Sequence, residues 1–196
     1  MLKTKITILF LITILFTSCF FKKKTSVFQD TLYQDQLSSK SEYIIYEPLT
    51  EEDQIYFAKK IGVDKKEIID GKLYKFIKEW EGTRYLLGGE SKAGIDCSAL
   101  MQQLFKKVYD YKLPRTAEEM AYDKNIEQFQ SKKHLREGDL VFFRITDEKI
   151  ISHVGVYLKN NKFLNSNLSG GVIISDLNTP YWRNFYVVSG RLKTPN

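Results

Sequence analysis

The sequence has 196 residues, of which 43% are hydrophobic and 14% aromatic, and it carries a formal net charge of +6 at pH 7. This length favours one domain of ordinary size, and the apolar content is sufficient for a hydrophobic core, which excludes disordered and collagen-like classes. Because the lysines are intermixed with 24 acidic residues and the sequence has no zinc-finger spacing or RNA-binding aromatic motif, we expect no nucleic-acid partner.

Residues 1–18 have the pattern of a secretory signal peptide. Two lysines precede an apolar run from Ile6 to Phe16, which has the length of a signal-peptide core. Since this run is too short to span a bilayer, a permanent transmembrane helix is the less favoured alternative. The run leads into Thr17, Ser18 and Cys19, an ending that resembles a bacterial lipoprotein cleavage box with Phe16 in place of the usual Leu. The resemblance implies a lipid on Cys19 that anchors the protein to a membrane.

The polar segment 19–41 is predicted to be a flexible tether because it has little periodicity. It leads into a helical extension over residues 42–72. Within this extension, Thr50-Glu51-Glu52-Asp53 resembles a capping box that begins a helix to about Lys60, and Lys65–Trp80 has a second helical pattern. The next segment, Glu81–Ile95, contains four glycines and is predicted to be a loop and not a helix or strand.

Apolar residues then recur from Cys97 to Val108 at the spacing of one face of an amphipathic helix. Asp96 is a preferred N-cap residue, so Cys97 is predicted to be the first residue of this helix, where the helix dipole lowers the pKa of a thiol. With Cys19 used by the lipid, Cys97 is an unpaired thiol in an exported protein, either inert and buried or reactive. Its place behind a glycine-rich loop favours the reactive alternative.

The rest of the chain is predicted to be mainly β-structure. A short capped helix over Thr116–Tyr122 is followed by apolar or alternating segments that indicate strands. These strands are Leu140–Phe143, Val154–Leu158, Phe163–Asn165, Val172–Ile174 and Phe185–Val188. Because helices come first and strands later, we expect an α+β domain.

Several motifs stand in a fixed order from Gly82 onward. They are Gly82-Thr83-Arg84-Tyr85, Gly88-Gly89, Gly94-Ile95-Asp96-Cys97-Ser98-Ala99-Leu100, Leu113-Pro114-Arg115-Thr116, Gly138-Asp139-Leu140-Val141-Phe142-Phe143 and Ser152-His153-Val154-Gly155-Val156-Tyr157. Together they resemble the NlpC/p60 family. The resemblance implies a papain-like fold, with N-terminal helices packed on an antiparallel sheet, for a catalytic domain over residues 73–196. It also implies a cysteine peptidase that cuts stem peptides of bacterial cell-wall peptidoglycan, either between D-glutamate and a diamino acid or at a cross-link.

The same resemblance assigns roles to individual residues. Cys97 matches the family nucleophile and His153 the general base. The third polar residue falls on Asn165, where the family often has His, and an Asn carbonyl oxygen can accept the imidazole N–H and orient the ring. Tyr85 matches a tyrosine whose hydroxyl could donate to the developing oxyanion beside the backbone N–H of Cys97. A second departure from the family pattern is Ala99, where Gly is usual. Tyr85 and Arg115 could equally be packing or surface residues.

Whether Asn165 can reach His153 depends on the hairpin between them. The two residues are 12 positions apart. They therefore share a face of the sheet only if the hairpin pairs odd-numbered residues of one strand with odd-numbered residues of the other. That requires an odd loop or a bulge. A plain two-residue turn at Asn160-Asn161 would send Asn165 to the opposite face.

The mechanism implied by a thiol and an imidazole needs no metal and no cofactor, and two His with one free Cys are too sparse for a zinc site. We expect a monomer in the cell envelope, outside the cytoplasm, with peptidoglycan as its partner and the lipid on Cys19 as its membrane anchor. Two alternatives stay open. One is a wall-binding lipoprotein that cuts weakly or not at all, supported by Asn165 and Ala99, and the other is an acyltransferase that uses the same Cys and His.

Overall fold

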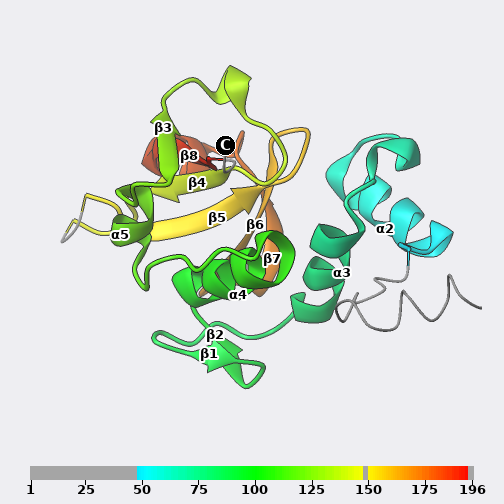
Figure 1. The fold of residues 1–196 in the computed structure, drawn as a ribbon, viewed down its shortest axis with the longest axis horizontal. Coiled ribbons are helices and arrows are strands. Elements are labelled where there is room, and N and C mark those ends of the chain that lie inside the picture. The colour runs from blue at the N-terminus through cyan, green and yellow to red at the C-terminus, as the bar shows by residue number, and fades with distance from the viewer. Residues whose placement is uncertain (1–47, 148–149, 194–196) are drawn as a thin grey trace, which may run out of the picture. The chain divides into compact units, whose positions relative to one another are not determined.

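The computed structural model describes residues 48–147 and 150–193, and most of its helices precede its main sheet along the chain (Figure 1). The helices are α2 (Glu51–Ile61), α3 (Gly71–Trp80), α4 (Cys97–Tyr109), α5 (Ala117–Ala121) and α6 (Pro180–Phe185). The main sheet has the strand order β3-β8-β4-β5-β6-β7, from β3 (Ile126–Phe129), β4 (Leu140–Phe143), β5 (His153–Tyr157), β6 (Lys162–Asn167), β7 (Gly171–Asp176) and β8 (Tyr186–Leu192). All its neighbouring strands are antiparallel. The predicted α+β class, with N-terminal helices and an antiparallel sheet, is confirmed.

The predicted signal peptide, tether and lipidated Cys19 lie outside the described residues. In the part of the chain that the structure describes, no helix combines the length and the apolar character needed to cross a membrane.

Helix α2 begins and ends where its sequence predicts. The hydroxyl of Thr50 accepts a hydrogen bond from the backbone N–H of Asp53 at 3.1 Å, and Gly62 ends the helix in the left-handed conformation with φ of 81°. The buried side chains Phe57 and Ile61 join the same core as Leu73, Tyr74 and the later strands. The segment predicted as a helical extension therefore shares one core with the later strands, and the predicted boundary at residue 72 lies inside α3.

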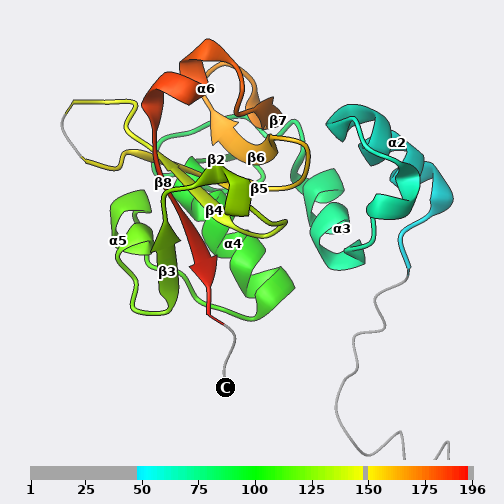
Figure 2. The same ribbon diagram turned by 90° about the horizontal axis from the view of Figure 1, so that it is seen from above.

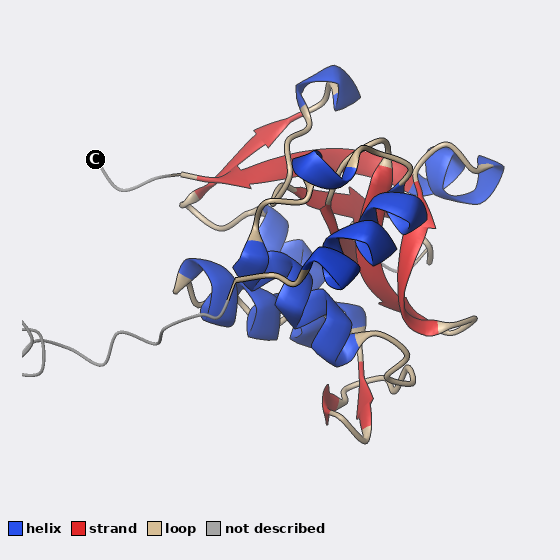
Figure 3. Cartoon of the chain, turned by 90° about the vertical axis from the view of Figure 1, so that its right-hand side faces the viewer, coloured by secondary structure: helices blue, strands red, loops and turns tan. Residues whose placement is uncertain are grey.

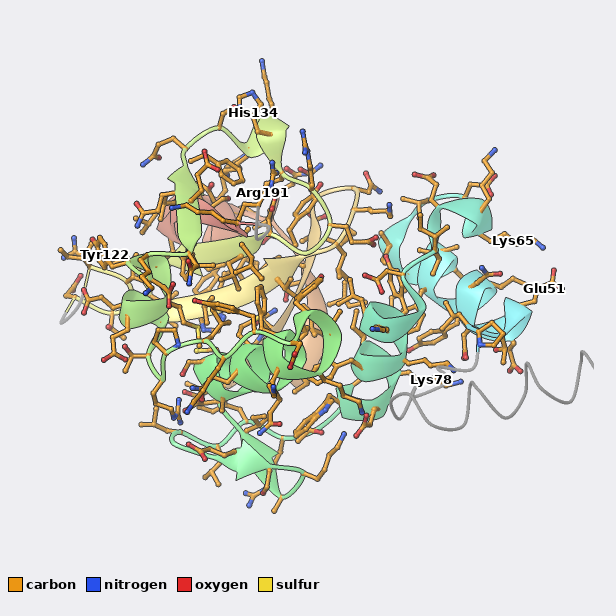
Figure 4. All side chains as sticks on the ribbon, viewed as in Figure 1. Glu51, Lys65, Lys78, Tyr122, His134 and Arg191 are labelled. Carbon is orange, nitrogen blue, oxygen red and sulfur yellow. The ribbon has the colours of Figure 1, made fainter. Side chains whose placement is uncertain are left out.

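Two ion pairs flank these first helices. Lys65 pairs with Glu51 at the surface (Figure 4), and Lys78 pairs with Asp53, which is buried. The exposed Lys65–Glu51 pair contributes little to stability. Phe57 is fully buried and packs on Tyr74 of α3, with ring centroids 5.0 Å apart, and this apolar contact holds α2 against α3.

Two sequence predictions in this region are wrong. Lys65–Trp80 is not one helix, because Asp64 caps a single 3₁₀ turn over Lys65–Glu67 and Asp70 caps a new helix that starts at Gly71. The side chain of each Asp accepts a hydrogen bond from a backbone N–H that follows it in the chain. The regular helical hydrogen bonds therefore begin again after Asp70. Glu81–Ile95 is not entirely loop, because β1 (Glu90–Ser91) pairs with β2 (Gly94–Ile95) in a short hairpin before α4.

The main sheet is covered on both faces at its centre. In β4, Leu140 and Phe142 join the core that also contains α4, whereas Val141 and Phe143 pack on the other face. All four β4 residues are therefore buried, which explains why this strand is a continuous apolar run instead of an alternating one. Figure 3 shows the helical layer against one face of the sheet.

The sequence did not predict β3 or α6. Strand β3 is a short edge strand in which only Ile126 is buried, so its alternation is weak. Helix α6 has six residues and begins with Pro180 in its first turn, which is too short for a helical period. Figure 2 shows α6 beside β6. The ring of Trp182 in α6 packs against Phe163 of β6, with ring centroids 5.1 Å apart.

Candidate active site

The predicted start of the cysteine helix is confirmed. Asp96 has an extended backbone and accepts a hydrogen bond from the N–H of Ala99 at 2.7 Å, so Cys97 is the first residue of α4. The Cys97 side chain packs into the core, with 8% of its surface exposed. The backbone N–H groups of Val154, Ser98 and Cys97 itself act to lower the pKa of its thiol. The start of α4 and strand β5 share one hydrophobic core, which contains Cys97, Leu100 and Val154.

His153 and Asn165 lie side by side, as predicted. Val156 of β5 pairs with Leu164 of β6, so Asn165 lies opposite Gly155 and diagonal to His153 on the same face. Nε2 of His153 is 3.3 Å from Oδ1 of Asn165. Both side chains are buried, and Asn165 is fully enclosed.

This shared face comes from the turn between β5 and β6. The backbone N–H of Leu158 donates to the carbonyl oxygen of Lys162 at 2.8 Å, so three residues connect the paired positions. Asn160 and Asn161 take left-handed conformations, with φ of 49° and 59°, and Lys162 N–H closes the turn onto Lys159 O at 2.8 Å. The turn thus has the odd number of connecting residues that is needed to place His153 and Asn165 on the same face of the sheet.

Neighbouring groups orient the Asn165 amide. Its Nδ2 donates to Ser175 Oγ at 2.8 Å and to the carbonyl oxygen of Ile173 at 3.4 Å, and its Oδ1 accepts from Asn167 Nδ2 at 2.9 Å. A carbonyl oxygen can only accept, so the amide nitrogen faces Ile173 and the oxygen faces His153. Nε2 of the neutral imidazole then carries the proton, and Nδ1 is left to accept one.

A cavity of about 430 Å³ brings the predicted residues together. Its walls include Tyr85, Cys97, Ser152, His153, Ser175 and Trp182. The structure therefore places the thiol, the imidazole and the tyrosine at one cavity, with Asn165 behind the imidazole. A larger cavity of about 550 Å³ beside β3 contains His134 and Arg136 but none of these residues. Ala99 is buried in α4 and is not part of the cavity wall.

Burial sets the protonation states of the thiol and the imidazole. It raises the pKa of Cys97 to about 11, although nearby backbone N–H groups act in the opposite direction. It lowers the pKa of His153 to about 4, against smaller opposing effects from the Asn165 hydrogen bond and the Asp96 charge. The backbone N–H groups at the helix start act to lower the pKa of Cys97, in the predicted direction, but desolvation of the thiolate outweighs them and the net shift is upward. With these pKa values, the neutral thiol and the neutral imidazole are the favoured forms at neutral pH.

Burial also acts on Tyr85, the predicted oxyanion donor. It raises the pKa of Tyr85, and the negative charge of Asp96, with that of the Cys97 thiolate where it forms, acts in the same direction. The phenol therefore stays protonated and able to donate at neutral pH.

Comparison with known proteins agrees with this geometry. The model of the NlpC/P60 family matches residues 82–191, which include Tyr85, Cys97, His153 and Asn165. The chain belongs to the NlpC/P60 family.

Two curated relatives illustrate the likeness within the NlpC/P60 family. A probable endopeptidase NlpC homolog of Haemophilus influenzae is 44% identical over 124 residues, which cover 63% of each chain. The murein DD-endopeptidase MepS/murein LD-carboxypeptidase of Escherichia coli K12 is 44% identical over 109 residues, or 55% of each chain. The chain thus spans between about half and two thirds of the length of these relatives.

The fold is also that of solved NlpC/P60 proteins. A lipoprotein-like NLP/P60 family protein of Staphylococcus aureus superposes with a TM-score of 0.55 at 23% identity, covering 82% of this chain and 48% of that one. At 23% identity, this comparison shows that the two proteins share a fold, and nothing more is inferred from it.

The NlpC/P60 domain has two further site residues that sequence reasoning missed. Trp182 of α6 stacks on His153, with ring centroids 5.1 Å apart and ring planes 24° apart. A tryptophan in a helix of six residues carries no periodic signal that could have indicated this contact. Arg115 binds the Asp96 carboxylate with two guanidinium nitrogens, at 2.7 and 3.2 Å. Arg115 lies in the motif Leu113-Pro114-Arg115-Thr116, but this motif does not indicate that Asp96 is its partner.

No group of three or more His, Cys, Asp or Glu side chains that could bind a metal ion occurs among residues 48–147 and 150–193 of this NlpC/P60 protein. The second histidine, His134, is exposed in a 3₁₀ turn remote from Cys97.

Proposed function

We propose that this protein is a cysteine endopeptidase that hydrolyses peptide bonds in the stem peptides or cross-links of peptidoglycan. The observation that carries the proposal is the arrangement of His153, which shares a cavity with the thiol of Cys97 and whose Nε2 meets the buried amide oxygen of Asn165. The relatives, a probable endopeptidase and a murein DD-endopeptidase, support the substrate class.

The reaction starts from the neutral pair. As the sulfur of Cys97 attacks the carbonyl carbon of the scissile peptide bond, Nδ1 of His153 takes the thiol proton. The imidazolium then gives this proton to the leaving amine, and the C–N bond breaks to leave a thioester on Cys97. Water, deprotonated by the same imidazole, hydrolyses the thioester and regenerates the thiol. Coupling proton transfer to attack avoids a separate thiolate in a site where burial disfavours it.

The neighbouring groups have positioning and electrostatic roles in this scheme. Asn165 accepts the Nε2 proton and keeps Nδ1 directed to the cavity. The Tyr85 hydroxyl and the backbone N–H of Cys97 stabilise the negative charge on the substrate oxygen. Trp182 covers one face of the imidazole and limits its rotation.

Export and anchoring belong to the same proposal. Cleavage after Ser18 and acylation of Cys19 would hold the catalytic domain at a membrane outside the cytoplasm, next to the wall. Metabolic labelling with a tagged fatty acid tests this directly, with Cys19→Ser as the control. Label on the wild type alone is the expected result, and an unlabelled, freely released wild-type protein would remove the anchor.

Digestion of purified peptidoglycan, followed by mass identification of the fragments, tests the activity and the bond at once. Wild-type protein should release peptide fragments, whereas Cys97→Ala and His153→Ala should each abolish release with the fold intact. Their losses should not add, because nucleophile and base act as one unit. Wild-type protein that binds the wall without releasing fragments would favour the binding alternative. Transfer of an acyl group to a lipid, with no wall cleavage, would favour the acyltransferase.

A further inference from the structure

Arg115 is held at the start of α4 by contacts on both sides of it in the chain. Before it, Gln102 of α4 donates to the carbonyl oxygen of Leu113 at 2.9 Å. After it, Thr116 caps α5 through a reciprocal capping box with Glu119. The Arg115 backbone therefore runs alongside the first turns of α4, and its guanidinium is directed to the helix start.

The guanidinium connects three groups there. Its Nη2 and Nη1 donate to the two oxygens of Asp96 at 2.7 and 3.2 Å, and Nη1 also donates to Ser98 Oγ at 2.7 Å. Its Nε donates to Glu90 of β1 at 3.0 Å. This forked contact is specific to arginine, since a lysine ammonium could not bind both oxygens in the same plane.

Asp96 is a carboxylate with donors on both oxygens. Besides Arg115, it accepts from the backbone N–H of Gly88 at 3.0 Å, from that of Ala99 at 2.7 Å and from Ser98 Oγ at 3.0 Å. Burial alone would raise the pKa of Asp96, but the Arg115, Ala99 and Ser98 hydrogen bonds outweigh it and lower the pKa below its usual value. Asp96 is therefore ionised in the residue next to the nucleophile.

That charge acts on the reacting groups. The negative charge of Asp96 raises the pKa of Cys97, in addition to the larger effect of burial, and opposes the lowering of the His153 pKa by burial. The other ionisable group beside the thiol is Tyr85, from the glycine-rich loop. The positive charge closest to Asp96 is the guanidinium of Arg115. The same guanidinium also pairs with the carboxylate of Glu90, which offsets part of its positive charge.

Resting on the proposed function, we propose that Arg115 is a positioning residue of the active site that acts through Asp96. Its guanidinium fixes the carboxylate that begins α4 at Cys97, and it offsets part of the charge that this carboxylate exerts on the thiol and the imidazole. The carboxylate can thus cap the nucleophile helix with a smaller effect on the ionisation of the nucleophile.

The charge effect separates this role from a purely structural one. Arg115→Gln leaves the Asp96 charge uncompensated, so Cys97 should ionise less readily and His153 should be protonated at higher pH. Asp96→Asn in the same chain removes that charge, and the asparagine can still cap the helix. A structural defect caused by the loss of Arg115 would not be repaired by the second substitution.

Arg191 offers a matched control. It binds Asp139 with Nε and Nη2, both at 2.8 Å, and also donates to the carbonyl oxygen of His134 (Figure 4). The exposures of the two pairs are similar, 31% and 3% for Arg191 and Asp139 against 36% and 7% for Arg115 and Asp96. The Arg191 pair lies at the opposite end of β4 and β5 from His153.

The experiment measures two rates as a function of pH in the full chain. The first is alkylation of Cys97 by iodoacetamide, followed by peptide mass so that Cys19 is counted separately, and the second is release of peptidoglycan fragments. Arg115→Gln should slow alkylation at pH 8 by about threefold to tenfold, equivalent to a rise of about half to one unit in the pKa of the thiol. It should also move the acid limb of the fragment-release rate to higher pH. Arg115→Lys should give intermediate values.

The double variant Arg115→Gln/Asp96→Asn should recover most of the alkylation rate, and Arg191→Gln should alkylate and titrate as the wild type does. The proposal is overturned if Arg115→Gln and Arg115→Lys both alkylate at the wild-type rate, or if the double variant is as slow as Arg115→Gln. Wild-type protein that releases no fragments at any pH would instead refute the proposed function, while the alkylation rates still decide the role of Arg115.

Discussion

Nε2 of His153 meets Oδ1 of Asn165 at 3.3 Å although the two residues belong to different strands. The contact has two causes. The β5–β6 turn has an odd number of connecting residues, which places both side chains on one face, and Gly155, which lies opposite Asn165 on that face, has no side chain to separate them. This hydrogen bond selects Nδ1 as the basic nitrogen of His153.

Asn165→Ala should lower turnover by about tenfold to a hundredfold, because it removes one buried hydrogen bond that orients the base but leaves nucleophile and base in place. Peptidoglycan digestion under single-turnover conditions measures the effect. Asn125→Ala, which removes the amide bound to Tyr111 far from Cys97, is the control and should keep the wild-type rate. A loss as complete as that of Cys97→Ala, in a folded protein, would mean that Asn165 does more than orient the ring.

Gly155→Ala should destabilise the protein by about 1–3 kcal/mol and reduce turnover as well. An added Cβ would lie 2.5 Å from the carbonyl oxygen of Leu164, 2.7 Å from the Phe163 ring and 3.2 Å from the Asn165 Cβ, so strand β6 must move away from His153. Urea unfolding and digestion measure the two effects. Gly71→Ala, where the nearest atom is 3.8 Å away, should be tolerated, and equal behaviour of the two variants would contradict the packing argument.

Acid should destabilise the wild type through His153. Burial lowers the pKa of His153 to about 4 in the folded state, while an unfolded histidine titrates near 6.5. Between these values the unfolded chain binds more protons, so stability falls as the pH decreases, by about 2–3 kcal/mol from pH 7 to 4.5 for this residue alone. Urea unfolding at both pH values should show a smaller acid loss for His153→Gln.

The exposed His134 provides the comparison for that experiment. His134→Gln should retain the full acid sensitivity of the wild type because its imidazole is exposed in the folded protein. An acid loss in His153→Gln as large as that of the wild type would show that His153 is not the group responsible.

Asn160→Ala should cost about 2–3 kcal/mol of stability. The Asn160 amide donates to the carbonyl oxygens of Ile61 and Gly62, at 3.0 and 3.1 Å, and its backbone is left-handed with φ of 49°. Alanine loses both hydrogen bonds and adds backbone strain, whereas Asn160→Gly loses only the hydrogen bonds and should cost less. Thermal or urea unfolding of both variants checks the order, and an alanine variant as stable as the glycine variant would contradict it.

Local chemistry made several parts of this protein predictable from sequence. Thr50, Asp96 and Thr116 accept the N–H groups of the turns that follow them, so they indicate helix starts regardless of the rest of the fold. The apolar stripe from Cys97 to Val108 and the apolar run of β4 likewise follow from period and burial. The motif order around Cys97 and His153 indicated the family, which the family match confirms.

Tertiary structure decided what depends on segments distant in the chain. The sequence required an odd β5–β6 connection for Asn165 to meet His153, but only the folded hairpin shows that the connection has three residues. Trp182 contacts His153, and Arg115 contacts Asp96. In each pair the residues belong to different elements, and their spacing in the sequence does not indicate that they meet. The thiol pKa depends on the burial of Cys97 in the folded chain, and this burial outweighs the lowering effect of the helix start that the sequence alone indicated.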